Sequence, residues 1–423
     1  VSSAASDVYK RQLQEIELSE GLEKIGESAF KNCSALKKIT IPASVKQIEA
    51  SAFRDCIALQ EITLLSKDTT FETDTFRNCP GVVKRPEDPV EGVKRSGPMD
   101  LAEGGTVLKK YHGTDACVIV PAGVTAIAKE CFVNCMSLQE IELPEGLEEI
   151  GKSAFEGCSS LKRIVIPEGV RSIREKTFCE CTALQEIRLP DGLELIGRSA
   201  FSECEALQEI RLPDGLKEIG SDAFSGCRSL RQITVPVGVK CIETAVFQSC
   251  RALQEVHLPE GLEQIGMFAF EDCDTLTRIV LPASLKRLCR GAFENCTSLL
   301  EAQLPDGLEE LQDDAFEYCR SLQKVTIPAQ VRQIERAAFY YCQSLQEVQL
   351  PEELNEIGED AFAHCWALKR IVIPAGVEKV GEHAFWECYS LQNIAVLSDD
   401  TEIAEDAFED CPGTVKRGTG SLF

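Results

Sequence analysis

A phenylalanine recurs along this chain at intervals of 23 residues, and this repeat constrains the fold more than any other feature. In most copies Ala precedes the Phe, and Cys follows three residues after it. Sixteen positions carry the pattern: Phe30, Phe53, Phe76, Phe132, Phe155, Phe178, Phe201, Phe224, Phe247, Phe270, Phe293, Phe316, Phe339, Phe362, Phe385 and Phe408. So short a unit cannot bury its own apolar side chains, so the units are expected to stack into a repeat solenoid with one core along its axis.

Residues 143–166 show one complete unit. The apolar spacing of Leu161, Ile164 and Ile166 predicts a short strand, and Pro167 ends it because proline has no N–H to donate. The apolar spacing in 147–150 predicts a second short strand. In 155–161 the apolar residues recur every third position, as in a tight helical turn. Each unit is therefore predicted to form one coil with parallel strands and tight turns.

The composition suits a chain with a large buried interior, since 44% of its 423 residues are hydrophobic. No apolar run approaches the roughly 18 residues of a membrane-spanning helix. The formal net charge of -25 would repel phosphate groups, so nucleic acid and anionic membrane surfaces are poor candidate partners.

The repeat is interrupted once, between Phe76 and Phe132, by a segment rich in proline, glycine and charge. Residues 65–81 and 397–413 share the same Leu-Ser and Cys-Pro-Gly elements at identical spacing, as two array-ending units would. We therefore predict four parts: 1–12, a non-native segment; 13–83, a first array truncated at its start; 84–106, a linker or insertion; and 107–423, a second array with a terminal capping unit.

Residues 1–12 are set apart because Asp7–Gln12 resembles the translation of a transposase adapter used to prepare DNA sequencing libraries, and the repeat begins at Leu13. The chain also starts without methionine, so we expect it to be a fragment. An ordinary flexible N-terminus is the alternative. A signal peptide or further repeats could precede Leu13 in either case.

Sixteen of the 21 cysteines, from Cys33 to Cys411, occupy the same position of each unit. Adjacent coils lie about 4.8 Å apart, which keeps equivalent Cβ atoms beyond the roughly 3.8 Å of a disulfide. We expect a column of free, buried thiols. The sequence has neither a C-x-x-C pair nor a nearby His that would complete a set of metal ligands, so no metal site is predicted. Five cysteines lie outside the column: Cys117, Cys131, Cys179, Cys241 and Cys289.

The sequence contains no recognisable enzyme motif. Its four histidines are His112, His257, His364 and His383, and none belongs to a nucleophile, phosphate-binding or zinc-protease pattern. The many carboxylates fall in the turns, where solvated coil edges explain them better than acid and base catalysis. We predict no catalytic residue, no metal and no cofactor.

Acidic and basic residues largely alternate in the strand position just before the central Ile, as in Glu140, Arg163 and Glu186. In a parallel, in-register sheet these side chains are lateral neighbours, and opposite charges contribute roughly 0.2–1 kcal/mol per pair. Strand register and sheet stability explain this row. The position after the Ile has no aromatic residues and gives only weak support to glycan stacking there.

One departure from the repeat lies in the C-terminal third. Turn positions that are polar in most other units become aromatic, and they include both tryptophans and four of the six tyrosines. Clustered Trp and Tyr residues are typical of binding hot spots. The candidate partner-binding patch comprises Tyr318, Tyr340, Tyr341, His364, Trp366, Trp386 and Tyr389. Aromatic packing between neighbouring turns is the alternative explanation.

The motif L-P-x-G-[LV]-x-x-I-x-x-x-A-F-x-x-C-x-x-L-x-x-I resembles the BspA-like, or treponemal-type, leucine-rich repeat over nearly the whole chain. It lacks the Asn-x-Leu tail of commoner leucine-rich repeats. The resemblance implies a right-handed coil and a bacterial protein that is secreted or displayed on the cell surface. It also implies a role in adhesion or in binding host proteins.

Two functions fit these observations. The first is a non-enzymatic scaffold that binds a protein, with a glycan as a less favoured ligand. The second is a structural spacer array within a larger multidomain surface protein. The sequence leaves the ligand and the oligomeric state open.

Overall fold

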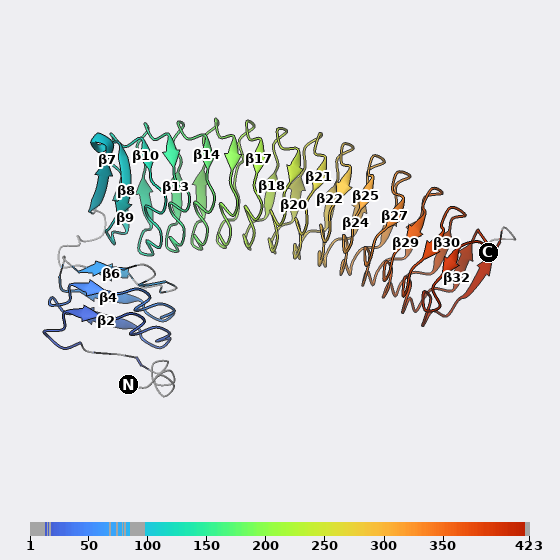
Figure 1. Ribbon diagram of the computed structural model, residues 1–423, viewed down its shortest axis with the longest axis horizontal. Coiled ribbons are helices and arrows are strands. Elements are labelled where there is room, and N and C mark those ends of the chain that lie inside the picture. Colours follow the sequence, from blue (N-terminus) through green and yellow to red (C-terminus); the bar gives the residue numbers. More distant parts are fainter. Residues whose placement is uncertain are drawn as a thin grey trace. The chain divides into compact units, whose positions relative to one another are not determined.

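The computed structural model describes residues 13–14, 16, 18–66, 69–72, 75–77, 79, 82–84 and 98–418. The chain forms a parallel β-solenoid of about sixteen turns with a 23-residue period, and the described residues contain no α-helix (Figure 1). This confirms the predicted fold class. The non-native segment predicted for residues 1–12 lies outside the described residues.

Two compact units make up the structure. The first comprises Val1–Gly192 with Glu203–Ala206, and the second comprises Leu193–Ser202 with Leu207–Phe423. This division differs from the array boundary predicted at residues 84–106, which stays a prediction.

The first unit contains β1 to β15. Their bounds are β1 Lys24–Ile25, β2 Lys38–Ile41, β3 Gln47–Ile48, β4 Glu61–Leu64, β5 Thr70–Phe71, β6 Val82–Lys84, β7 Met99–Ala102, β8 Val107–Tyr111, β9 Cys117–Ile119, β10 Ala126–Ile127, β11 Glu140–Glu142, β12 Glu149–Ile150, β13 Arg163–Val165, β14 Ser172–Ile173 and β15 Glu186–Arg188.

The second unit contains β16 to β34. Their bounds are β16 Leu195–Ile196, β17 Glu218–Ile219, β18 Gln232–Thr234, β19 Cys241–Ile242, β20 Glu255–His257, β21 Gln264–Ile265, β22 Arg278–Val280, β23 Arg287–Leu288, β24 Glu301–Gln303, β25 Glu310–Leu311, β26 Lys324–Thr326, β27 Gln333–Ile334, β28 Glu347–Gln349, β29 Glu356–Ile357, β30 Arg370–Ile373, β31 Lys379–Val380, β32 Asn393–Val396, β33 Glu402–Ile403 and β34 Thr414–Arg417.

Equivalent residues of successive coils pair in parallel strands. In β13 and β15, for example, Ile164 pairs with Ile187 and Arg163 pairs with Glu186. Ile164 is buried while Arg163 is exposed, because successive side chains of a strand point to opposite faces. The predicted strands at 161–166 and 147–150 correspond to β13 and β12.

An antiparallel hairpin precedes the parallel coils of residues 107 onward. Strand β7 pairs with β8, and the 3-10 helix η1, Glu103–Gly105, connects them. Residues 99–102 belong to the segment predicted as a linker, and its Pro- and Gly-rich composition gave no sign of this strand. The hairpin occupies a strand edge that would otherwise expose unpaired backbone groups.

Columns of stacked phenylalanine rings form the core of both units. The rings of Phe270 and Phe293 lie 5.2 Å apart at 2° to each other. Phe316 and Phe339 lie 5.5 Å apart at 3°. All four side chains are fully buried. Stacking each coil on the next therefore buries the apolar side that a single coil could not hide.

The turn around each core phenylalanine uses a left-handed backbone. Beside Phe155, Ser153 has a φ of 55° and Gly157 has a φ of 73°. Hydrogen bonds from Cys158 N to Phe155 O (3.1 Å) and from Leu161 N to Cys158 O (3.0 Å) close the predicted tight turn. A Cβ atom disfavours positive φ, which explains why Gly, Asn, Asp and Ser are frequent at these two positions.

Candidate partner-binding site

All seven residues of the predicted patch lie in the second unit, and the structure brings them together in one network of ring contacts. They occupy the turns of four consecutive coils between Phe316 and Tyr389 (orange to red in Figure 1). We refer to them as the aromatic cluster: Tyr318, Tyr340, Tyr341, His364, Trp366, Trp386 and Tyr389.

The centre of the cluster is the pair of Tyr341 and His364, whose ring centroids lie 4.6 Å apart. Tyr341 also contacts Tyr318 at 5.3 Å and Trp366 at 5.6 Å. His364 contacts Trp386 at 4.7 Å in an edge-to-face arrangement. These separations are typical of favourable aromatic pairs, so the side chains hold one another in place.

The outer members of the cluster are open to solvent. Trp366 is 37% exposed and Tyr389 is 53% exposed, with their ring centroids 6.3 Å apart. Tyr318, Tyr341 and Trp386 are half-buried, whereas His364 is buried. The cluster thus has a packed base under an exposed pair of rings.

Three cluster residues stand in the left-handed turn position, with φ of 56° at Tyr318, 60° at Tyr341 and 60° at His364. This conformation costs roughly 1–2 kcal/mol for a residue with a Cβ atom. Backbone hydrogen bonds tie the turns together, from Tyr318 N to Tyr340 O (2.8 Å) and from His364 N to Trp386 O (2.8 Å). The backbone beneath the rings is therefore held in place by the chain's own hydrogen bonds.

Glu387 places a carboxylate among these rings. Its Oε2 lies 3.0 Å from Nδ1 of His364, within ion-pair distance when the imidazole is protonated, although Nδ1 makes no hydrogen bond of acceptable geometry. A hydrogen bond between Tyr389 and Glu387 raises the pKa of the Tyr389 hydroxyl to about 12. The cluster is therefore both aromatic and acidic.

Three residues that the sequence did not single out belong to this site. Glu387 is one, and His383 is another, with its ring 5.4 Å from that of Trp386. Arg320 is the third, because its guanidinium lies over the ring of Tyr318 at 5.8 Å and over that of Tyr341 at 5.9 Å. Charged residues are frequent in turns throughout the chain, so only the coordinates separate these three from the rest.

The row of charges on the strand face is paired as predicted. Arg163 Nη2 lies 2.8 Å from Glu140 Oε1, and Arg370 Nη2 lies 3.4 Å from Glu347 Oε1. These side chains are largely exposed, so each pair contributes little stability.

His112 and His257, the two histidines outside this site, each face a single carboxylate. His112 Nε2 lies 2.7 Å from Asp100 and His257 Nε2 lies 3.1 Å from Glu255. Among the residues that the structure describes, no group of three or more His, Cys, Asp or Glu side chains could hold a metal ion. No helix in the same residues is long and apolar enough to cross a bilayer.

The cysteines are free thiols, and most are buried. Of the five outside the column, Cys131, Cys179 and Cys289 are buried, while Cys117 and Cys241 are partly exposed. Burial raises the pKa of the Cys131 and Cys179 thiols to about 12. Thiols with raised pKa values are poor nucleophiles at neutral pH.

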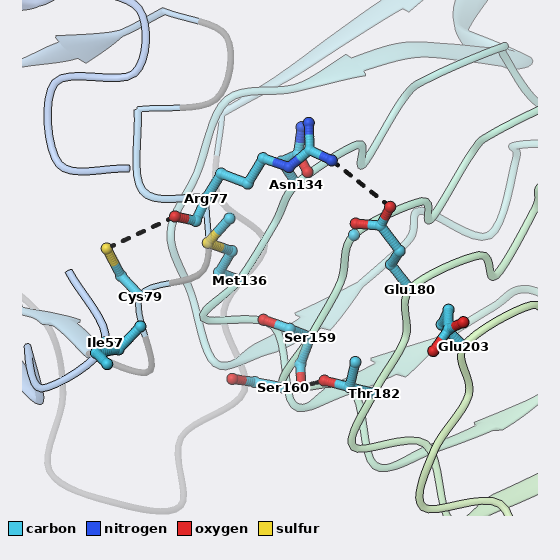
Figure 2. Close-up of a pocket in the computed structure, with 11 residues that line it drawn as sticks. Ile57, Arg77, Cys79, Asn134, Met136, Ser159, Ser160, Glu180, Thr182 and Glu203 are labelled. Atoms are coloured by element: carbon cyan, nitrogen blue, oxygen red, sulfur yellow. Dashed lines mark hydrogen bonds and ion pairs between the residues drawn. The ribbon is translucent and has the colours of Figure 1, made fainter. Parts of the chain in front are cut away.

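A pocket of about 510 Å³ lies in the first unit, as Figure 2 shows. Its lining includes the polar side chains of Asn134, Ser159 and Thr182. The lining also includes the carboxylates of Glu180 and Glu203 and the thiol of Cys79, and no sequence motif assigns a reaction to them.

The model of one known protein family matches most of the chain. The family model described as "BspA type Leucine rich repeat region (6 copies)" matches residues 6–84, 116–231, 172–300, 217–342 and 309–416. No curated protein matches the chain.

Solved structures of bacterial leucine-rich repeat proteins resemble the chain. A leucine-rich repeat protein from Bacteroides ovatus is 28% identical, with a TM-score of 0.63 over 78% of this chain and 94% of that one. A leucine rich cell surface protein from Faecalibacterium prausnitzii is 28% identical, with a TM-score of 0.53 over 79% and 96%. A leucine-rich repeat protein of T. pallidum is 35% identical, with a TM-score of 0.41 over 43% and 91%.

Proposed function

Because the chain belongs to the family of BspA-type leucine-rich repeat proteins, we propose that it is a non-enzymatic scaffold that binds a protein partner through the aromatic cluster. Solenoids present long repeated surfaces, and proteins built from leucine-rich repeats generally bind proteins. The observation that carries the proposal is the gathering of seven aromatic rings on four consecutive coils, with Trp366 and Tyr389 exposed.

The fold itself does not require aromatic residues at these turns. Asn134 and Gly157 fill the position equivalent to Tyr341 in other coils, and both tolerate a left-handed backbone well. Placing Tyr or His there costs conformational energy that the smaller residues would avoid. Glu180 and Glu203 take the same left-handed backbone in other coils, so the choice of Tyr or His there, rather than the strain itself, supports a functional role for the side chains.

The aromatic composition also favours a protein over a glycan as the partner. Trp and Tyr bury a large area at low entropic cost and dominate the energetics of protein interfaces. On the strand face, the position of Val165 and Val280 is exposed, and no other coil has a tryptophan or tyrosine at that position. The cluster is accordingly the surface on which we locate binding.

We propose that the chain acts outside a bacterial cell, either displayed on the cell surface or secreted. The F. prausnitzii relative is described as a cell surface protein, and the other similar structures named above are bacterial. An adhesion role would follow if the partner lies on a host or neighbouring cell.

The test uses the full chain and a variant of the two exposed rings, Trp366→Ala with Tyr389→Ala. A matched control removes exposed apolar side chains from the strand face, Val165→Ser with Val280→Ser. Proteins captured by the wild-type chain from host and bacterial extracts are identified by mass spectrometry. Each captured protein is then purified, and its affinity for the three chains is measured by surface plasmon resonance.

We expect the cluster variant to bind the partner at least about tenfold more weakly, and the control to bind like the wild type. Unchanged affinity in the cluster variant, or a loss in the control alone, would reject the proposal. A chain that retains nothing specific would instead support the spacer function. Circular dichroism of each variant shows whether the fold is intact.

A further inference from the structure

The charges around the aromatic cluster are mainly negative. Glu317 and Glu294 face Tyr318, and Asp360 and Glu317 face Tyr340. Glu387 and Asp410 face Tyr389. Partial burial, with a smaller contribution from these carboxylates, raises the pKa of the hydroxyls of Tyr318 and Tyr340. The site is thus arranged to attract a positive charge.

A row of carboxylates leads into the cluster from the preceding coils. Glu271, Glu294 and Glu317 each follow a core phenylalanine directly, and the next residue of this row is Tyr340. The backbone joins these turns, because Asn295 N donates to Glu317 O at 2.7 Å. Burial and the neighbouring carboxylates raise the pKa of both Glu294 and Glu317 to about 7. Arg290 and Arg336 offset part of the repulsion within this row, and a further cation beside it would relieve more.

The cluster already binds one cation from its own chain. The guanidinium of Arg320 lies over the faces of Tyr318 and Tyr341, at 5.8 Å and 5.9 Å from the ring centroids. A guanidinium within about 6 Å of a ring face is attracted by the ring quadrupole. This contact occupies one end of the cluster and shows which chemistry its rings accept.

The other end offers the same chemistry with more exposed surface. Trp366 and Tyr389 are the exposed pair, and tryptophan is the best cation-binding ring among the side chains. The carboxylate of Glu387 is hydrogen-bonded to Tyr389, and its Oε2 lies 3.0 Å from Nδ1 of His364. Arginine combines a planar face that stacks on rings with a fork of donors that pairs with a carboxylate.

We propose that Trp366, Tyr389 and Glu387 bind an arginine side chain of a basic segment of the partner protein, and that the Glu294 and Glu317 row attracts the remaining positive charge of that segment. This inference rests on the proposed function and specifies the chemistry of its partner. The guanidinium stacks on the two rings and donates to Glu387, as Arg320 stacks on the tyrosines at the opposite end.

The tryptophans provide a local signal for the test, because the chain has only two and both belong to the cluster. Selective excitation of tryptophan reports binding at this site alone. The full chain is titrated with a hexa-arginine peptide and with a hexa-citrulline peptide, which has nearly the same shape but no charge. Choline chloride is titrated separately as a cation without N–H donors.

Three variants accompany the wild type. Trp366→Ala with Tyr389→Ala keeps the net charge and leaves Trp386 as the reporter. Glu387→Gln removes one charge at the site. Glu145→Gln with Glu148→Gln removes two exposed charges in the first unit and serves as the control.

We expect the arginine peptide to bind the wild type, the citrulline peptide to bind at least about tenfold more weakly, and choline to bind more weakly than the arginine peptide. The ring variant and Glu387→Gln should each lose about tenfold in affinity for the arginine peptide, while the control changes less than twofold. Equal affinity of the ring variant and the wild type would show that the peptide binds the acidic surface at large, and this would overturn the proposal.

Equally tight binding of citrulline or choline would also overturn it, because the site would then not select a guanidinium. These failures are separable from failure of the proposed function. If the ring variant still loses its captured protein partner while the arginine peptide does not bind, the cluster is the binding site and only the chemistry assigned to the partner is wrong.

Discussion

The Sγ atom of Cys158 lies 3.1 Å from the carbonyl oxygen of Phe132 in the preceding coil, 26 residues earlier. The same carbonyl also accepts a hydrogen bond from Cys135 N at 3.1 Å. The relationship recurs in the second unit, where Cys296 Sγ lies 3.1 Å from Phe270 O. Each such thiol therefore fills the core and links two coils, which explains why a small residue with a donor stands at this position.

Replacing Cys158 with Ala should lower the free energy of unfolding by about 1–2 kcal/mol, because it leaves a small cavity and removes the contact to Phe132. Urea unfolding followed by circular dichroism measures the change. Glu168→Ala, at an exposed turn, is the control and should leave the unfolding midpoint unchanged. Equal midpoints for Cys158→Ala and wild type would show that the thiol contributes nothing.

The thiols should differ sharply in reactivity. Only Cys117, Cys135, Cys241 and Cys411 are partly exposed, while the other cysteines are buried. A hydrogen bond from the Cys388 thiol lowers the pKa of Cys411, so alkylation at neutral pH should modify Cys411 first. Mass spectrometry after brief treatment with iodoacetamide identifies the modified sites. Rapid modification of buried thiols in the folded chain would contradict the stacked core.

The period, the paired strands and the buried columns could be predicted from the sequence because identical spacing forces equivalent residues into register. The hydrogen bond between Cys158 and Phe132 could not, since the direction of a thiol depends on coordinates. The hairpin of β7 and β8 was also missed. Its residues do not follow the 23-residue pattern, and short antiparallel pairing leaves a weak signal in a single sequence.

Replacing Ala245 with glycine should stabilise the folded chain. Its φ of 55° strains a residue with a Cβ atom, so Ala245→Gly should raise the free energy of unfolding by about 0.5–1 kcal/mol. Ala223 is buried and does not have a positive φ, so Ala223→Gly should lower stability by a similar amount. Thermal unfolding of both variants beside the wild type checks the opposite signs. Destabilisation by both substitutions would argue against the left-handed turn.

Stability should fall as pH rises from about 4.5 to about 7 because of Glu294 and Glu317. Partial burial and the surrounding carboxylates raise the pKa of both groups to about 7 in the folded chain, from 4.5. Their contribution is therefore fully present below pH 4.5 and is lost as the folded carboxyl groups ionise. Melting temperatures at pH 5 and pH 8 measure the loss.

The double variant Glu294→Gln with Glu317→Gln should show a smaller fall in melting temperature between these pH values than the wild type. Glu168→Gln, with an exposed side chain, is the matched control and should behave like the wild type. If the double variant and the wild type lose the same amount, the two carboxyl groups do not govern this part of the pH profile.

The residues of the candidate site could be chosen from the sequence, because aromatic residues at polar turn positions stand out against the twelve other copies of the same unit. The chemistry of the site could not be predicted from it. Arg320 and Glu387 occupy positions where charge is common, and only the ring-face contact of the former and the closeness of the latter to His364 distinguish them.

Hydrogen–deuterium exchange of the chain with its captured protein partner tests the location of binding most directly. We predict that protection from exchange is confined to peptides covering the turns that follow Phe316, Phe339, Phe362 and Phe385. Protection along the exposed strand face, or in the first unit alone, would contradict the account.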